Sequence, residues 1–263
     1  RYSTRRPGTA VRAGLACPAR GRLLCRQSVM PSPSAITAVL FDLDGTLYHQ
    51  RPLRMRMARE LALFVLRRPV EGGRTARVLR AFRHAQETLR MRGVPYDEDV
   101  QIEEAASRVG LDTRAVRAVV REWMFERPLP HLLPHRAAGS VPLLDHLAAR
   151  GIRAGVLSDY AAVDKLEALG LRQRFSVVLA AGDPDVRALK PSPRGFLAAA
   201  SRWGVRPGQV LVVGDRVDAD GAGAEAAGMA SVIVTRRAAG PVSAAMTFVN
   251  SLEQVKRVID DRC

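Results

Sequence analysis

Five short apolar runs that alternate with helical patterns constrain the fold of this 263-residue chain more than any other feature. Each run has the length and near-continuous apolar character of a strand that is buried on both faces of a parallel sheet. The runs span residues 36–41, 152–157, 177–180, 210–213 and 231–234. The helical patterns between the last four runs span residues 161–169, 193–203 and 220–228. This alternation predicts βαβ units and a doubly wound, mainly parallel, Rossmann-like α/β sheet.

Residues 50–149 interrupt this alternation, because they contain several helical patterns and no convincing strand. The clearest pattern places Val116, Val119, Val120 and Trp123 on one helical face, at positions i, i+3, i+4 and i+7. Further apolar stripes of this kind lie within residues 53–65, 78–89 and 102–109. We interpret their Met, Phe and Trp side chains as core packing and not as a cofactor site. The patterns predict an all-helical cap, residues 50–139, inserted into an α/β core of residues 35–49 and 140–263.

The first 29 residues differ from the rest of the chain. They hold seven arginines and no acidic residue, so they contribute +7 of the formal net charge of +15. They are acid-poor and Arg-rich like an organellar transit peptide, but they lack the apolar stretch of a secretory signal. Met30 comes directly before a Pro/Ser linker at 31–34. We therefore expect Met30 to be the natural start and residues 1–34 to be a disordered or artefactual extension.

Composition argues against nucleic-acid and membrane partners. The basic residues are 38 Arg and only three Lys, and beyond residue 29 they are interleaved with acids and form no basic stripe with aromatic residues. No apolar run approaches the roughly 20 residues that span a bilayer. Cys17, Cys25 and Cys263 have no metal-binding spacing and form no disulfide framework. A reducing, cytoplasmic location fits this pattern best, and the oligomeric state leaves no signal in the sequence.

Two carboxylates follow the first predicted strand, in the order Asp42, Leu43, Asp44, Gly45, Thr46. In a doubly wound sheet, ligands bind beyond the carboxyl ends of the strands, so both carboxylates can face the ligand crevice. Their mutual repulsion there favours a bound cation or a shared proton. A simple Asp-Gly turn is the alternative explanation for this motif alone.

Two later strand ends offer groups that suit a phosphate. Ser158 and Asp159 follow the run 152–157, where a hydroxyl and the backbone N–H groups after it can bind phosphate oxygens. A helix N-cap role fits these two residues equally well. Lys190 lies just before a predicted helix that Ser192 would cap and Pro193 would begin, a place where an ammonium group can neutralise a phosphate. An ordinary surface lysine is the alternative.

Three carboxylates cluster after the fourth predicted strand: Asp215, Asp218 and Asp220. Clusters of oxygen ligands without histidine suit Mg²⁺, which prefers octahedral oxygen coordination and keeps several waters. Capping of the helix that starts near Asp220 accounts for one of these carboxylates, but not for three.

The four motifs, in this order and at the ends of four elements, resemble the haloacid dehalogenase-like hydrolase superfamily over residues 36–235. The helical insertion is similar to the C1-type cap of the phosphoglycolate phosphatase-like branch. This resemblance implies a phosphatase in which Asp42 is the nucleophile that forms an aspartyl-phosphate and Asp44 is the general acid/base. Dehalogenase members lack the second carboxylate of the first motif. Asp44 therefore favours phosphate ester chemistry.

The resemblance also implies the ligands of metal and phosphate. Mg²⁺ would be held by Asp42, the backbone carbonyl of Asp44, Asp215 and Asp220, with Asp220 binding directly or through water. The phosphate of a small phosphorylated substrate would contact the residues of the other motifs, which are Ser158, Asp159, Lys190 and Thr46.

Two other functions stay open at this point. A phosphomutase uses the same two aspartates and the same metal, but it needs a cap that binds a bisphosphorylated sugar. The cap offers possible anion contacts that no pattern ranks: His84, Arg54, Arg56 and Arg83. A non-catalytic binding scaffold would be marked by loss of Asp42 or Asp44, and both are present. Tyr48 and His49 either contact the substrate or pack against the linker to the cap.

Overall fold

The structure, a computed structural model, describes residues 35–235, 243 and 245–261. The predicted N-terminal extension, residues 1–34, lies outside the described residues. Within the described ranges, no helix combines the length and the apolar character that crossing a membrane requires.

Six parallel strands form one sheet in the order β3-β2-β1-β4-β5-β6. Their bounds are Ala38–Phe41 (β1), Arg153–Ser158 (β2), Val177–Ala180 (β3), Val210–Gly214 (β4), Ala230–Val234 (β5) and Met246–Val249 (β6). β1 lies at the centre, where Phe41 pairs with Val156 of β2 and Val213 of β4. The predicted fold class, a doubly wound parallel sheet with an all-helical insertion, is confirmed. β6 is an addition to the predicted strands, and its partly buried residues at the sheet edge lack a continuous apolar run.

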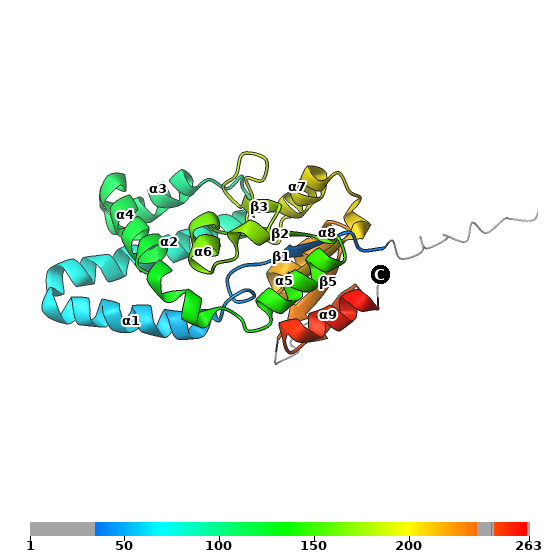
Figure 1. Cartoon of the computed structure of the whole chain (residues 1–263). Helices are drawn as coiled ribbons and strands as arrows, with labels where there is room; N and C mark the ends of the chain where they lie inside the picture. Colours follow the sequence, from blue (N-terminus) through cyan, green and yellow to red (C-terminus); the bar gives the residue numbers. More distant parts are fainter. Residues whose placement is uncertain (1–34, 236–242, 244, 262–263) are drawn as a thin grey trace, which may run out of the picture. The chain divides into compact units, whose positions relative to one another are not determined.

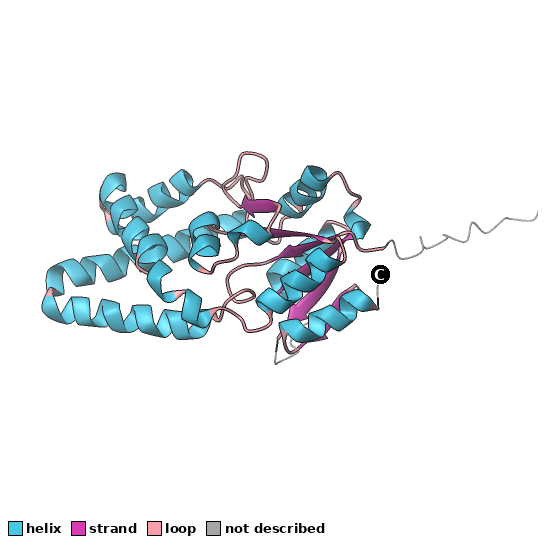
Figure 2. Cartoon of the chain, viewed as in Figure 1, coloured by secondary structure: helices cyan, strands magenta, loops and turns pink. Residues whose placement is uncertain are grey.

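Helices cover both faces of the sheet (Figures 1 and 2). Alternate residues of β1 belong to two separate apolar clusters, because successive side chains of a strand point to opposite faces. Val39 and Phe41 share a cluster with α5, α6 and α9, whereas Leu40 shares one with α7 and α8. These helices span Ser140–Ala149 (α5), Val163–Ala168 (α6), Arg194–Trp203 (α7), Ala222–Ala226 (α8) and Leu252–Asp260 (α9). Two short 3-10 turns, Arg172–Arg174 (η4) and Pro207–Gln209 (η5), connect elements of this layer.

The segment between β1 and α5 is helical throughout, apart from its connecting turns (Figure 2). Its elements are Gln50–Arg67 (α1), Pro69–Arg92 (α2), Glu98–Val109 (α3), Thr113–Val120 (α4), the π-helical Arg121–Glu126 (η1) and the 3-10 turns Leu129–His131 (η2) and Leu133–His135 (η3). The predicted apolar stripes of α2, α3 and α4 pack together around Phe82, Ile102 and Val116, so the insertion has a core of its own. We keep residues 50–139 as the proposed extent of the cap.

The helix starts after β2, β3 and β4 differ slightly from the predicted ones. α6 begins at Val163 and α7 at Arg194, so Pro193 takes the N-cap position predicted for Ser192. The predicted helix 220–228 is a π-helical turn, Val217–Gly221 (η6), followed by the short α8. Asp220 lies within that turn, and its Oδ2 accepts a hydrogen bond from the Arg216 backbone N–H at 3.1 Å.

Candidate active site

Asp42 lies directly after β1, where its buried carboxylate meets a buried lysine. Lys190 Nζ is 2.5 Å from Asp42 Oδ1 and 2.7 Å from Asp220 Oδ1. The hydroxyl of Thr46 donates a hydrogen bond to the other oxygen of Asp42, at 3.1 Å. The structure therefore brings together residues from the first, third and fourth sequence motifs, although Lys190 and Asp42 are 148 residues apart.

Asp42, Asp215 and Asp220 form a cluster in which one oxygen of each carboxylate lies within 4.8 Å of the others. Asp215 Oδ1 is buried and has no hydrogen-bond partner among the described residues. A Cβ at Gly45, where φ is +115°, would lie 2.2 Å from Asp215 Oδ2, so this turn requires glycine. An unpartnered, buried carboxylate oxygen in an all-oxygen donor set fits a hard divalent cation such as Mg²⁺.

The electrostatics of the cluster agree with this fit. Burial raises the pKa of Asp42 to about 7. Lys190 lowers this pKa, whereas the carboxylates of Asp220 and Asp215 raise it further. Burial and Asp220 likewise raise the pKa of Asp215 to about 6. Burial opposes the charge of Lys190, but Asp220 and Asp42 raise the pKa of its ammonium group. Burial, together with repulsion between the carboxylates, disfavours the ionised forms of Asp42 and Asp215 despite Lys190, so added positive charge would stabilise them.

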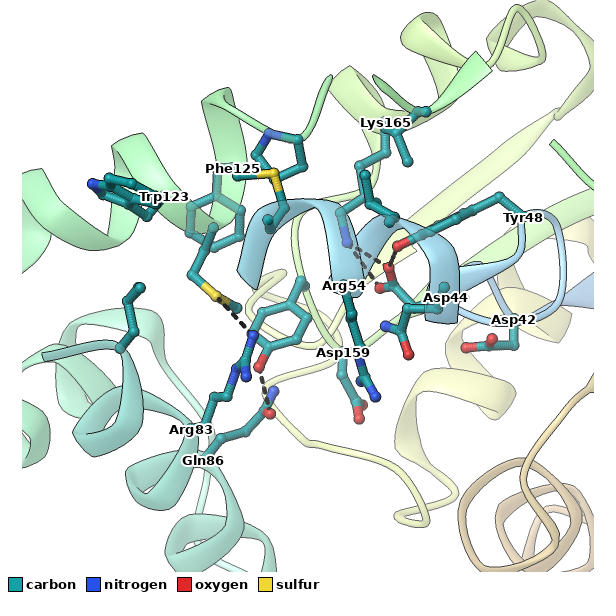
Figure 3. Close-up of a pocket in the computed structure, with 18 of the residues that line it drawn as sticks. Asp42, Asp44, Tyr48, Arg54, Arg83, Gln86, Trp123, Phe125, Asp159 and Lys165 are labelled. Carbon is teal, nitrogen blue, oxygen red and sulfur yellow. Dashed lines mark hydrogen bonds and ion pairs between the residues drawn. The ribbon is translucent and has the colours of Figure 1, made fainter. Parts of the chain in front are cut away.

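Asp44 has a separate set of partners. Lys165 Nζ contacts both of its carboxylate oxygens, at 2.7 and 2.9 Å, and the Tyr48 hydroxyl donates a hydrogen bond to Oδ1 (Figure 3). Burial alone would raise the pKa of Asp44, but Lys165 and Tyr48 hold it below its usual value. The carboxylate of Asp44 thus stays outside the cluster formed by Asp42, Asp215 and Asp220.

The second sequence motif is tied to the cap. Asp159 accepts a hydrogen bond from the Lys190 backbone N–H at 3.0 Å and an ion-paired one from Arg90 of α2 at 2.7 Å. Arg90 also donates to the backbone carbonyl of Lys190 at 3.0 Å. Ser158 is buried, and its Oγ accepts the Tyr160 backbone N–H at 3.1 Å. The Asp159 carboxylate is thus directed at Arg90 and Lys190, which leaves its backbone N–H as the group suited to phosphate.

A cavity of about 1000 Å³ lies between the strand ends and the helical insertion. Asp42, Asp44, Lys190, Asp215 and Asp220 all line it. Asp159 lines it as well, whereas Ser158 and Thr46 are buried behind the wall.

Some of the other residues named in the sequence analysis line the cavity, and others lie away from it. Asp218 is exposed and pairs with Arg216, away from the carboxylate cluster. Among the possible anion contacts, Arg54 and Arg83 line the cavity. Arg56 pairs with Glu60, and His84 bonds to Thr88, so neither faces the cavity.

Sequence reasoning missed Lys165, Arg90 and the contact of Tyr48 with Asp44. Lys165 had one available signal, since it is one of only three lysines in an arginine-rich chain. Arg90 had no such signal, because the chain has 38 arginines and this one lies on a regular helical pattern like many of the others. The fold brings Lys165 to Asp44 from α6 of the α/β core, and it brings Arg90 to Asp159 from α2 of the helical insertion.

Comparisons with known proteins identify relatives of this chain. The family model of haloacid dehalogenase-like hydrolases matches residues 36–228. A phosphoglycolate phosphatase of Salmonella choleraesuis (strain SC-B67) is 37% identical over 219 residues, which cover 76% of this chain and 81% of that protein. A glyceraldehyde 3-phosphate phosphatase of Methanopyrus kandleri is 31% identical over 208 residues, with 76% and 84% of the two chains covered.

Solved structures show the same fold. A phosphatase of this superfamily from Thermococcus onnurineus superposes with a TM-score of 0.58 at 25% identity, covering 85% of this chain and 98% of that one. A 2-haloacid dehalogenase from Pseudomonas syringae pv. Tomato DC3000 gives 0.64 at 22% identity, covering 87% and 100%. The chain belongs to the haloacid dehalogenase-like hydrolase family. The predicted family and the predicted enzyme class, a phosphatase-type hydrolase, are both confirmed.

Proposed function

We propose that this chain is a Mg²⁺-dependent phosphatase that hydrolyses a phosphorylated small molecule through an aspartyl-phosphate on Asp42. One observation supports this proposal most: Asp42 and Asp44 line one cavity but have different partners. Asp42 lies in the carboxylate cluster beside Lys190, whereas Asp44 is held apart by Lys165 and Tyr48. Two carboxylates in different surroundings suit two different catalytic roles.

The first half of the reaction forms the covalent intermediate. A carboxylate oxygen of Asp42 attacks phosphorus, the bond from phosphorus to the ester oxygen breaks, and Asp44 gives a proton to the departing alkoxide. The negative charge of the arriving phosphate favours protonation of Asp44, which Lys165 and Tyr48 otherwise hold ionised. Lys190 offsets negative charge on Asp42 and on the phosphoryl group.

The second half releases inorganic phosphate. Asp44, now ionised, accepts a proton from a water molecule whose oxygen attacks the phosphorus of the aspartyl-phosphate. The bond to Asp42 breaks, and both carboxylates return to their initial state. The backbone N–H of Asp159 would bind a phosphoryl oxygen in both halves.

Mg²⁺ would be held by the carboxylates of Asp42 and Asp215 and by the backbone carbonyl of Asp44. Both oxygens of Asp220 already accept hydrogen bonds, from Lys190 and from the Arg216 backbone, which favours a contact through water. The ion would supply positive charge against the phosphate and the clustered carboxylates. A cytoplasmic location stays a prediction from the cysteine pattern.

Asp42→Asn tests this function directly, with release of inorganic phosphate from an alkyl phosphate as the readout. We expect turnover to fall to the background rate, because asparagine is not a competent nucleophile. Asp185→Asn is the matched control, since Asp185 is exposed, pairs with Arg202 and lies outside this cavity. Near-normal turnover by Asp42→Asn would refute the assignment of Asp42 as nucleophile. Isomerisation of a sugar phosphate by the unmodified chain, without phosphate release, would instead indicate a mutase.

A further inference from the structure

The cavity is much larger than the reaction centre requires. Its volume of about 1000 Å³ lies at the upper end of the range found for pockets that hold drug-sized ligands. A phosphate ester with two or three carbons would occupy only the part next to Asp42. The remaining space is bounded by α1, α2 and η1 of the helical insertion, which points to a substrate that extends into it.

The cavity runs along two helices. On α1 one face lines it over three turns, through residues Gln50, Leu53, Arg54, Met57, Ala58 and Leu61. At 1.5 Å per residue this face is about 16 Å long. On α2 the lining extends from Arg90, which is bound to Asp159 in the reaction centre, back to Ala76, about 21 Å away. The cavity is therefore an elongated groove with the reaction centre at one end.

The middle of the groove presents hydrogen-bond donors that lack acceptors. Arg54 and Arg83 line it and form no ion pair with any described carboxylate, and the polar contact of Arg83 is a long one, 3.9 Å to the sulfur of Met124. Gln86 is buried; its Oε1 accepts the Tyr160 hydroxyl at 2.6 Å, and its Nε2 has no partner among the described residues. In Figure 3, Arg54, Arg83 and Gln86 lie between Trp123 and Asp42. Such donors would bind an acceptor, such as a carboxylate, in the middle of the ligand.

The far end of the groove has several large apolar side chains, beside the exposed Arg80 of α2. Leu61 of α1, Leu79 of α2, and Trp123 and Phe125 of η1 line this part. Figure 3 shows Trp123 on the side of the site away from Asp42, and its ring contacts Phe64 at 5.3 Å between centroids. Burying apolar ligand surface against these side chains would contribute binding free energy that a short ester cannot provide.

From this arrangement of the reaction centre, the hydrogen-bond donors and the apolar side chains along the groove, we infer that the substrate is a long, amphipathic phosphate monoester. Its phosphate lies at Asp42 and Lys190, an anionic or other acceptor group lies at Arg54, Arg83 and Gln86, and an apolar or aromatic part lies beyond them. This inference rests on the phosphatase function proposed above. It names the substrate class and makes the two- and three-carbon phosphates of the relatives poor substrates for this chain.

A matched pair of esters tests the inference. N-Acetyl-O-phosphoserine and N-octanoyl-O-phosphoserine carry the same phosphate, carboxylate and neutral amide, and they differ only in the length of the apolar tail. The expected result is a kcat/KM for phosphate release that is at least about tenfold higher for the octanoyl compound, used below its micelle concentration. Equal values, or a preference for N-acetyl-O-phosphoserine, would overturn the inference while leaving the phosphatase function intact. Absence of Asp42-dependent turnover for both esters would instead refute the function and the inference together.

Two leucines of α1 give a matched pair of variants that locates the tail. Leu61 lines the groove, whereas Leu63 is 51% exposed and does not. Leu61→Gln should lower the octanoyl-to-acetyl ratio of kcat/KM by about fivefold or more, and Leu63→Gln should leave that ratio unchanged. Leu79→Gln on α2 replaces Leu61→Gln if that variant does not fold. An unchanged ratio in the groove variant would show that the tail does not bind there and would overturn the inference.

Discussion

Two of the three lysines of this chain are buried at the reaction centre. Lys190 joins Asp42 to Asp220, and Lys165 holds both oxygens of Asp44. A lysine ammonium is a compact point charge that can approach carboxylates from any direction, whereas an arginine guanidinium is planar and wide. The contacts explain why lysine stands at these two positions in a chain that otherwise uses arginine.

Lys165→Gln should slow catalysis by misplacing Asp44. We expect kcat for an alkyl phosphate to fall by about tenfold or more, because small errors in the position of a catalytic group are costly. The loss should be smaller for p-nitrophenyl phosphate, whose leaving group needs little protonation, so steady-state kinetics with both esters gives the test.

Lys256→Gln is the control for this variant, because Lys256 is exposed on α9. An equal loss with both esters would contradict a role for Lys165 in positioning the general acid, and a rate within twofold of the unmodified chain would contradict any role.

Most of the residues at this scale could be predicted from the sequence. Asp42, Asp44 and Asp215 lie within three residues of the ends of apolar runs, and parallel strands bring such residues to one edge of the sheet. Lys165 could not be predicted, because it lies within an ordinary helical pattern and reaches Asp44 only across the folded chain. The same holds for Tyr48, whose hydroxyl is directed by the turn after β1.

Among the elements, α2 connects the helical insertion to the reaction centre. Arg90 binds both Asp159 and the carbonyl of Lys190, and a small apolar cluster formed by Leu89, Tyr96, Ala181 and Leu189 lies beside it. Three residues that line the groove, Arg83, Gln86 and Arg90, occupy one face of this helix. Recognition of the substrate and placement of Lys190 thus depend on the same element.

Arg90→Gln should therefore weaken both stability and catalysis. The variant leaves the Asp159 carboxylate without its arginine, and we expect a loss of about 1–3 kcal/mol in the free energy of unfolding. The kcat/KM should fall at least about tenfold, because the loop that carries Lys190 loses its contact with α2. Arg92→Gln on the same helix is the control, since Arg92 is exposed and 3.8 Å from Glu104. Equal behaviour of the two variants in thermal unfolding and kinetics would contradict this role of α2.

The existence of the elements was more predictable than their details. The long apolar stripes predict α1 to α4 because their spacing repeats over several turns. The π-helical η1 could not be foreseen, since the spacing from Val116 to Trp123 continues through its start without a break. β6 was missed because only Val249 of its four residues is fully buried, so no apolar run marks it.

At the scale of the whole molecule, a metal ion held by the proposed ligands in the carboxylate cluster would bind only the folded chain. A ligand that binds only the folded chain stabilises it, by an amount that grows with the logarithm of the ligand concentration above Kd. Mg²⁺ should therefore raise the midpoint of thermal unfolding of the unmodified chain and of Asp218→Asn, but not that of Asp215→Asn. Without Mg²⁺, Asp215→Asn should be at least as stable as the unmodified chain, because one of three repelling carboxylates is removed.

Differential scanning fluorimetry over a Mg²⁺ titration measures these shifts for the three proteins. An equal Mg²⁺-dependent shift in Asp215→Asn and the unmodified chain would contradict the proposed ligand set. A loss of the Mg²⁺-dependent shift in Asp218→Asn would indicate that the exposed carboxylate of Asp218 takes part in binding the metal.

Identification of the phosphorylated residue during turnover tests the central claim most directly. The chain is mixed with substrate and Mg²⁺, quenched in acid within the first turnovers, digested and analysed by mass spectrometry. We predict one phosphoryl group on the peptide that contains Asp42, absent from Asp42→Asn and lost on treatment with hydroxylamine. A phosphoryl group on another residue, or active turnover with Asp42 unmodified at every quench time, would contradict the claim.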